Sequence, residues 1–114
     1  MANSRAKFVT LAFPALGTAK TVGFRAAFTG QILSIGFGFE AAVDATNVVQ
    51  VEINEVDVTG GGVSLTAALS AVGKTLVLRP TALNTFTEGA FISIDTDGGG
   101  TVGDCHVTFA LEES

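Results

Sequence analysis

The chain alternates apolar and polar side chains most regularly in the stretch Asn47-Val48-Val49-Gln50-Val51-Glu52-Ile53-Asn54-Glu55. Successive side chains of an extended strand point to opposite faces, so Val49, Val51 and Ile53 would share one face. On a helix the same three side chains would be spread around the axis. The stretch therefore predicts a β-strand with one buried face and one exposed face.

The same alternation recurs on both sides of this strand. The segments that show it are Thr21–Thr29, Gln31–Ala41, Ile92–Asp95 and Cys105–Leu111. The buried face of the second segment is expected to carry Leu33, Ile35, Phe37 and Phe39. That of the last segment is expected to carry Cys105, Val107, Phe109 and Leu111. These repeats predict several strands that each bury one face.

Glycine-rich turns separate the predicted strands. They contain Gly30, Gly60–Gly62, Gly89 and Gly98–Gly100. Glycine accepts the positive φ angles that tight turns require. Only Leu65–Val72 is tolerant of helix, and one or two helical turns are expected there. Short strands separated by such turns predict an all-β fold, namely an antiparallel β-sandwich, jelly-roll-like, with about eight strands.

A chain of 114 residues has room for one domain. Residues 21–114 are predicted to form the β-sandwich domain, and residues 1–20 either an N-terminal arm or a first strand. Cys105 is the only cysteine, so a disulfide within the chain is impossible. No apolar run approaches the roughly 20 residues that span a bilayer, and no membrane partner is expected.

The charge composition argues against nucleic acid as a partner. The formal net charge is −5, and the six basic residues are scattered along the sequence. Binding to a phosphate backbone requires clustered Lys and Arg. Charged residues make up only 15% of the chain, against an average of about 25%. A surface with so little charge favours a protein that is extensively covered by protein partners.

Two short motifs could suggest ligand sites. Ala68–Thr75 ends in the Gly-Lys-Thr of a phosphate-binding loop, but that loop needs glycine at Ala68 and a helix after it, where Thr75–Arg79 has a strand pattern. Asp95, Asp97 and Asp104 could supply oxygen ligands to calcium. The twelfth position of that loop, which should hold a glutamate, is His106, so a hairpin turn is the preferred reading of Asp95–Gly100.

Groups capable of catalysis are few. Cys105 and His106 are adjacent, and adjacent strand residues point to opposite faces, so they should not form a nucleophile–base pair. A carboxylate pair of Glu52 with Glu55 or Asp57 is conceivable, although solvated faces explain these residues better. The chain has no Trp or Tyr to stack on sugars. The sequence therefore predicts no enzyme, no catalytic residue, no cofactor and no metal site.

The region from about residue 24 to residue 112 resembles a known family. Its motifs are Ile53-Asn54, then Val58-Thr59-Gly60-Gly61, then Arg79-Pro80-Thr81-Ala82-Leu83-Asn84-Thr85-Phe86-Thr87-Glu88-Gly89-Ala90-Phe91-Ile92-Ser93-Ile94. They are similar to those of small β-sandwich virion proteins of tailed bacteriophages, of the capsid decoration (cement) or head/tail fibre type. The chain departs from the pattern at Glu55, where the family has a turn glycine, and at Ala90, where it has an acidic residue.

The resemblance implies a structural role in a virion. We expect a capsid decoration protein that forms a homotrimer, binds the major capsid protein and lies on the outer capsid surface, with residues 1–20 reaching onto a neighbour. The alternative is a receptor- or glycan-binding fibre module. A third hypothesis is a secreted bacterial adhesion domain, which would require removal of the N-terminal segment.

Overall fold

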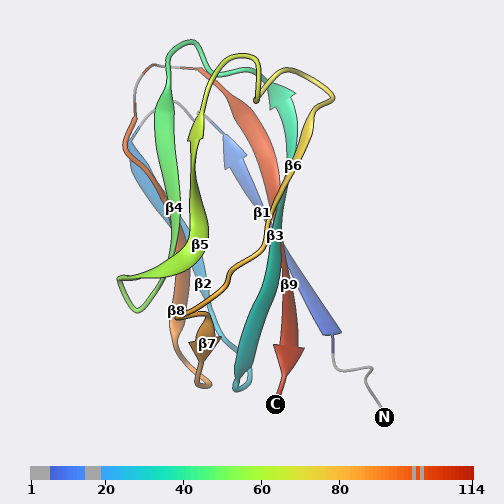
Figure 1. Ribbon diagram of the computed structural model, residues 1–114, viewed down its shortest axis with the longest axis vertical. Helices are drawn as coiled ribbons and strands as arrows, with labels where there is room; N and C mark the ends of the chain where they lie inside the picture. Colours follow the sequence, from blue (N-terminus) through green and yellow to red (C-terminus); the bar gives the residue numbers. More distant parts are fainter. Residues whose placement is uncertain (1–5, 15–18, 99, 101) are drawn as a thin grey trace.

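The computed structural model describes residues 6–14, 19–98, 100 and 102–114 (Figure 1). Within this part of the chain there is no helix, and the strands form two antiparallel sheets. The strands are β1 (Ala6–Pro14), β2 (Lys20–Arg25), β3 (Gly30–Ala41), β4 (Asn47–Ile53), β5 (Val56–Leu65), β6 (Thr75–Leu78), β7 (Thr85–Phe86), β8 (Phe91–Thr96) and β9 (Asp104–Glu113). The predicted all-β sandwich is confirmed.

The strand order is that of a jelly roll. One sheet has the order β1-β9-β3-β6, with the two-residue β7 also paired to β3, and the other has the order β2-β8-β4-β5. β1 and β3 lie in the five-stranded sheet and β2 lies in the four-stranded sheet. β8 and β9 likewise lie in different sheets, so these neighbours in the chain face each other across the core. Of the segment 1–20, residues 6–14 form a strand paired to β9, while residues 1–5 and 15–18 lie outside the described residues.

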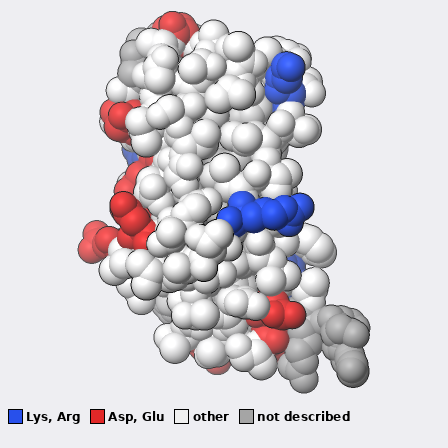
Figure 2. Space-filling view, in the orientation of Figure 1, with Lys and Arg blue, Asp and Glu red and all other residues white. Residues whose placement is uncertain are grey.

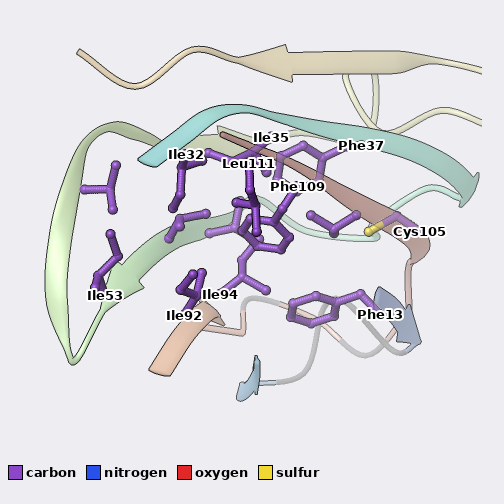
Figure 3. Close-up of a cluster of buried hydrophobic side chains, with 14 of the residues drawn as sticks. Phe13, Ile32, Ile35, Phe37, Ile53, Ile92, Ile94, Cys105, Phe109 and Leu111 are labelled. Carbon is purple, nitrogen blue, oxygen red and sulfur yellow. The ribbon is translucent and has the colours of Figure 1, made fainter. Parts of the chain in front are cut away.

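The core lies between the two sheets, and alternate residues of the long strands fill it (Figure 3). The Phe109 side chain of β9 is fully buried and meets the ring of Phe24 from β2 edge to face, with 5.3 Å between ring centroids. In Figure 3, Leu111 and Ile35 from one sheet point towards Ile94 of the other. The buried positions that alternation predicted in β4 and β9 are confirmed.

The prediction for Leu33 is wrong. A β-bulge interrupts the pairing of β3 with β9 between Ile32 and Ser34. A bulge adds one residue to one strand, which reverses the inside and outside positions on its far side. Ile32 is therefore fully buried, Leu33 is 38% exposed, and the buried alternation resumes at Ile35.

The segment Leu65–Val72 contains a turn and no helix. The Ser70 N–H donates to the Thr66 carbonyl at 3.0 Å, and the Ser70 hydroxyl donates to the same oxygen at 2.8 Å. The Val43 N–H donates to the Ser70 hydroxyl oxygen at 2.9 Å. The Ser70 side chain is fully buried, and these bonds satisfy its polar atom while joining two loops.

The β4–β5 hairpin turns through Asn54 and Glu55, whose φ angles are 51° and 68°. Two successive positive φ angles are typical of the type I′ turn that suits a hairpin's twist. Glycine would adopt the second position without the steric cost that Glu55 incurs. Glu55 therefore occupies a turn position whose backbone conformation favours glycine.

The two sides of the sandwich differ. On one side, the segment after β6 crosses to β5, where the Thr59 N–H donates to the Ala82 carbonyl at 3.0 Å and the Thr81 N–H donates to the Thr59 carbonyl at 2.9 Å. On the other side, β1 pairs only with β9 and β2 only with β8, as far as the described residues go. The outer edge of β1 is thus an open sheet edge.

Candidate functional site

Three carboxyl groups gather on the outer face of the four-stranded sheet. Glu52 of β4 is the register partner of Asp57 of β5. On its other side β4 pairs with β8, where Asp95 lies opposite Gln50, one outward position away from Glu52. In Figure 2 acidic atoms gather along the margin at which Figure 1 places β4 and β5. We call Glu52, Asp57 and Asp95 the carboxyl cluster.

The cluster changes the acidity of its central member. Burial, followed by hydrogen bonding and charge repulsion from Asp95 and then from Asp57, raises the pKa of Glu52 from 4.5 to about 7. Each of these causes disfavours the ionised form. No Lys or Arg among the described residues forms an ion pair with any of the three carboxyl groups, so no nearby positive charge offsets the rise in the pKa of Glu52.

The neighbouring polar groups hold the cluster in place. The Thr21 hydroxyl of β2 donates to Asp95 Oδ1 at 2.5 Å. The Gln50 amide donates to the carbonyls of Val51 and Val58 at 2.9 and 3.1 Å. The side chains around the carboxyl groups are thus fixed by bonds across adjacent strands.

An open hollow of ≈ 690 Å³ lies beside the cluster. Its lining residues are Ala19, Lys20, Thr21, Val48, Gln50, Asp95, Thr96 and Asp97. The hollow is wide open to solvent, and it combines an apolar wall with a few polar groups, as small-molecule sites do. Asp95, Thr21 and Gln50 supply polar atoms, and the exposed Val48 supplies an apolar patch. The hollow could take a hydroxyl-rich or cationic group of a ligand.

The chemistry available around the hollow is limited. Glu52, with a pKa of about 7, could transfer a proton near neutral pH. The one cysteine belongs to β9 of the other sheet: burial, with the charges of Asp104 and Glu40, raises the pKa of Cys105 to about 12, so its thiol is a buried core group.

The three aspartates considered for calcium do not form a metal site. Asp97 Oδ1 accepts from the Val48 N–H at 2.8 Å, and the Asp97 N–H donates to the Val48 carbonyl at 3.0 Å. Asp104 begins β9, in the other sheet. Within the described ranges, no three His, Cys, Asp or Glu residues are placed to hold a metal ion.

The hairpin expected at Asp95–Gly100 is also wrong. β8 pairs with β2 and β4, whereas β9 pairs with β1 and β3, so the chain changes sheets between them. Glycine-rich composition predicts a turn, but it does not show which strand the chain pairs with next. The missing information is the strand order.

Cys105 and His106 point to opposite faces, as alternation predicts. Cys105 is fully buried, and His106 lies on the outer face with its Nδ1 atom 2.7 Å from Glu40 Oε1. Gly73-Lys74-Thr75 leads into β6, a strand, and the Gly73 N–H donates to the Phe39 carbonyl at 3.1 Å. Neither motif forms the chemical site that it resembles.

The outer face of the five-stranded sheet carries many small side chains and few charged ones. Its small outward residues are Thr10, Ala12, Gly36, Gly38, Thr75, Thr108 and Ala110, which the strand register places side by side. Thr10 and Thr108 hydroxyls lie 3.1 Å apart. Phe8 and Val77 stand exposed beside this surface, by 69% and 52%. We call these seven residues the small-residue face; His106, which contacts Glu40, lies between Ala12 and Gly38 in the strand register.

Comparison with known proteins gives no relative. No protein-family model matches the chain, and no curated protein sequence is significantly similar to it. Across the described ranges, no helix has the length and apolar character required to cross a membrane.

We expect Glu52 to make stability depend on pH. Its pKa is about 7 in the folded chain and 4.5 as the ordinary value, so between these values the folded state holds more protons than the unfolded state. The contribution of Glu52 to stability is therefore complete below pH 4.5 and is lost as the pH rises through about 7. Glu52→Gln should flatten the change in urea midpoint between about pH 5 and about pH 8.

The control for this measurement is Glu55→Gln. Glu55 is exposed in the adjoining turn, so its replacement should leave the pH dependence as it is in the unaltered chain. An unaltered pH dependence in Glu52→Gln would show that the cluster does not govern it.

Proposed function

We propose that this chain is a structural protein of a bacteriophage virion, a decoration protein that binds the outer surface of the major capsid shell and stabilises it. The observation that carries the proposal is the small-residue face. A sheet surface of glycine, alanine and threonine can be covered by a partner with little desolvation of charge.

Side-chain entropy supports the same function. Covering glycine and alanine costs almost no rotamer freedom, whereas covering Lys, Arg or Glu costs up to about 2 kcal/mol each. The strands that supply this face lie in a sheet backed by a continuous core, so its shape is set before binding. A pre-formed surface loses less free energy on association.

The fold adds an argument by analogy. Jelly rolls occur in viral capsid proteins and in lectins, so the fold agrees with a virion role without requiring one. The sequence resemblance to phage decoration and fibre proteins points in the same direction. Together they favour a shell-binding role over a catalytic one.

A receptor- or glycan-binding fibre module is the second candidate, and the hollow beside the carboxyl cluster favours it. Asp95, Thr21 and Gln50 present polar atoms of the kind that bind sugar hydroxyls. A glycan array with the unaltered chain and with Asp95→Asn distinguishes the candidates. Binding that is lost in Asp95→Asn supports the fibre role, and no glycan binding favours the shell role.

Gly38→Arg is the test of shell binding. A Cβ atom added to Gly38 has no neighbour within 4 Å, so the substitution should leave the fold intact. A long charged side chain between the small-residue face and the shell is expected to weaken binding to empty expanded capsid shells by at least about tenfold. Co-sedimentation with shells over a series of concentrations measures the effect.

Ser64→Arg is the matched control. Ser64 is exposed on β5 in the other sheet, so the same charge is added away from the small-residue face. Shell binding by Ser64→Arg should equal that of the unaltered chain. Equal weakening by both variants would remove the small-residue face as the contact surface.

A further inference from the structure

The open edge of β1 is the starting point. β1 is nine residues long, and within the described part of the chain its only partner is β9. An unpaired strand edge carries backbone N–H and C=O groups that can pair with another strand. The corresponding edge of β5 on the opposite side is covered by the segment around Ala82. Among the described residues, an isolated bridge thus crosses to β5, whereas no segment pairs with the outer edge of β1.

Apolar side chains line the open side. Val9 and Leu11 of β1, and Val22 and Phe24 of β2, pack against the core but are only partly buried. Phe8 is 69% exposed. A second strand beside β1 would cover these groups while satisfying the backbone edge.

The distribution of charge favours a second copy of the chain as the occupant. The chain as a whole is acidic, yet no Asp or Glu precedes Glu40, so both β1 and β2 lack carboxylates. Two copies that met through their carboxyl clusters would repel each other. Two copies that meet at β1 bring together strands in which Lys7 is the one charged residue of Ala6–Pro14, so few charges oppose the contact.

The sequence of β1 is also complementary to itself. In an antiparallel pair centred on Thr10, each Val9 lies opposite the Leu11 of the other copy on the core side. Each Phe8 lies opposite an Ala12 on the outer side, a large side chain against a small one. A two-fold interface requires this relation, since every contact occurs twice. We propose that two copies pair through their β1 strands, which joins their five-stranded sheets into one continuous sheet.

Lys7 sets the limit of the paired region. Lys7 is the register partner of Leu111, whose side chain points inward, so Lys7 is on the inward-facing side of β1. An inward-pointing charge on an edge strand opposes pairing with a further strand. In the pair centred on Thr10, Lys7 lies opposite Phe13, outside the central five residues. Phe8–Ala12, where pairing is required, carries no charge.

The test uses the full chain and opposite charges at the two-fold axis. Thr10 is exposed, so Thr10→Glu and Thr10→Lys should fold. In the proposed dimer, each variant places two like charges about 5 Å apart and should weaken association at least about tenfold. A mixture of the two variants places opposite charges together and should restore a dimer. Sedimentation velocity and light scattering over a concentration series measure the mass.

Thr108→Glu is the matched control. Thr108 is the register partner of Thr10 on the same face but one strand away from the open edge. Its two copies in the dimer would be separated by about three strand spacings, roughly 14 Å, which exceeds the screening length of about 10 Å at 0.1 M salt. We expect association by Thr108→Glu within about twofold of that of the unaltered chain.

The outcomes separate this pairing from other assemblies. The unaltered chain should reach the mass of two 11.6 kDa chains, and only the mixture of charge variants should recover it. A mass of one chain at all concentrations overturns the proposal, as does a trimer. If the two copies instead exchanged their β1 strands, Thr10 of one copy would lie beside Thr108 of the other and not beside the second Thr10. Failure of the mixture to restore the dimer therefore overturns the proposed pairing as well. Shell binding is measured separately, so this result is independent of the proposed virion role.

Discussion

Phe109→Ala is expected to lower the free energy of unfolding by about 3–5 kcal/mol. Phe109 lies on β9, between β1 and β3, and its ring is fully buried against Phe24 of the opposite sheet. Truncation removes the apolar area of the ring and its edge-to-face contact, and it leaves a cavity that two sheets cannot fill without moving together. Domains of this size have a total stability of about 5–15 kcal/mol, so the loss should be a large fraction of the total.

Phe8→Ala is the matched comparison, because it makes the same chemical change at a side chain that is 69% exposed. Its effect should lie within about 0.5 kcal/mol at protein concentrations too low for association. Urea unfolding followed by circular dichroism measures both variants. Similar losses for the two substitutions would contradict the core assigned to β9.

Gly30→Ala is expected to cost about 3 kcal/mol, through steric overlap in place of a cavity. Gly30 is buried at the start of β3, where it pairs with β9 on one side and β7 on the other. A Cβ atom at Gly30 would overlap the Glu112 carbonyl oxygen and lie 2.9 Å from its carbonyl carbon. These are backbone atoms of a paired strand, so relief requires β3 and β9 to separate at this end.

Gly38→Ala isolates that overlap from the general effect of removing a strand glycine. Gly38 lies on the same strand, and an added Cβ atom there has no neighbour within 4 Å. Its stability should stay within about 0.5 kcal/mol of that of the unaltered chain, or rise slightly because alanine restricts the unfolded state. Thermal or urea unfolding of the two variants, measured side by side, gives the comparison. A mild Gly30→Ala would mean that the β3–β9 contact is looser than described.

The fold could be predicted because side-chain alternation is a local property. Val49, Val51 and Ile53 are buried as their spacing indicates. Leu33 is the exception, since the bulge beside it is a property of the pairing between β3 and β9. Alternation shows that a residue belongs to a strand, but it cannot reveal where an extra residue reverses the two faces.

The surfaces could be predicted only in part, because they depend on strand order. Glu52 and Asp57 are close in sequence, so a pair of Glu52 with Glu55 or Asp57 is conceivable from the sequence, although solvated faces are the preferred explanation there; the structure makes Asp57 the register partner of Glu52. Asp95 joins them only because β8 lies beside β4, a pairing of segments far apart in the chain. The small-residue face has the same origin, since β1, β9 and β3 contribute separate parts of it.

The position of β9 has a consequence for synthesis on the ribosome. β9 is the last strand described, yet it occupies the place between β1 and β3. Until β9 has been synthesised, β1 and β3 therefore lack the strand that lies between them. We therefore expect the five-stranded sheet to close only after translation has passed β9. A stalled chain that ends before Asp104 would expose unpaired edges and apolar side chains of β1 and β3, to which chaperones can bind.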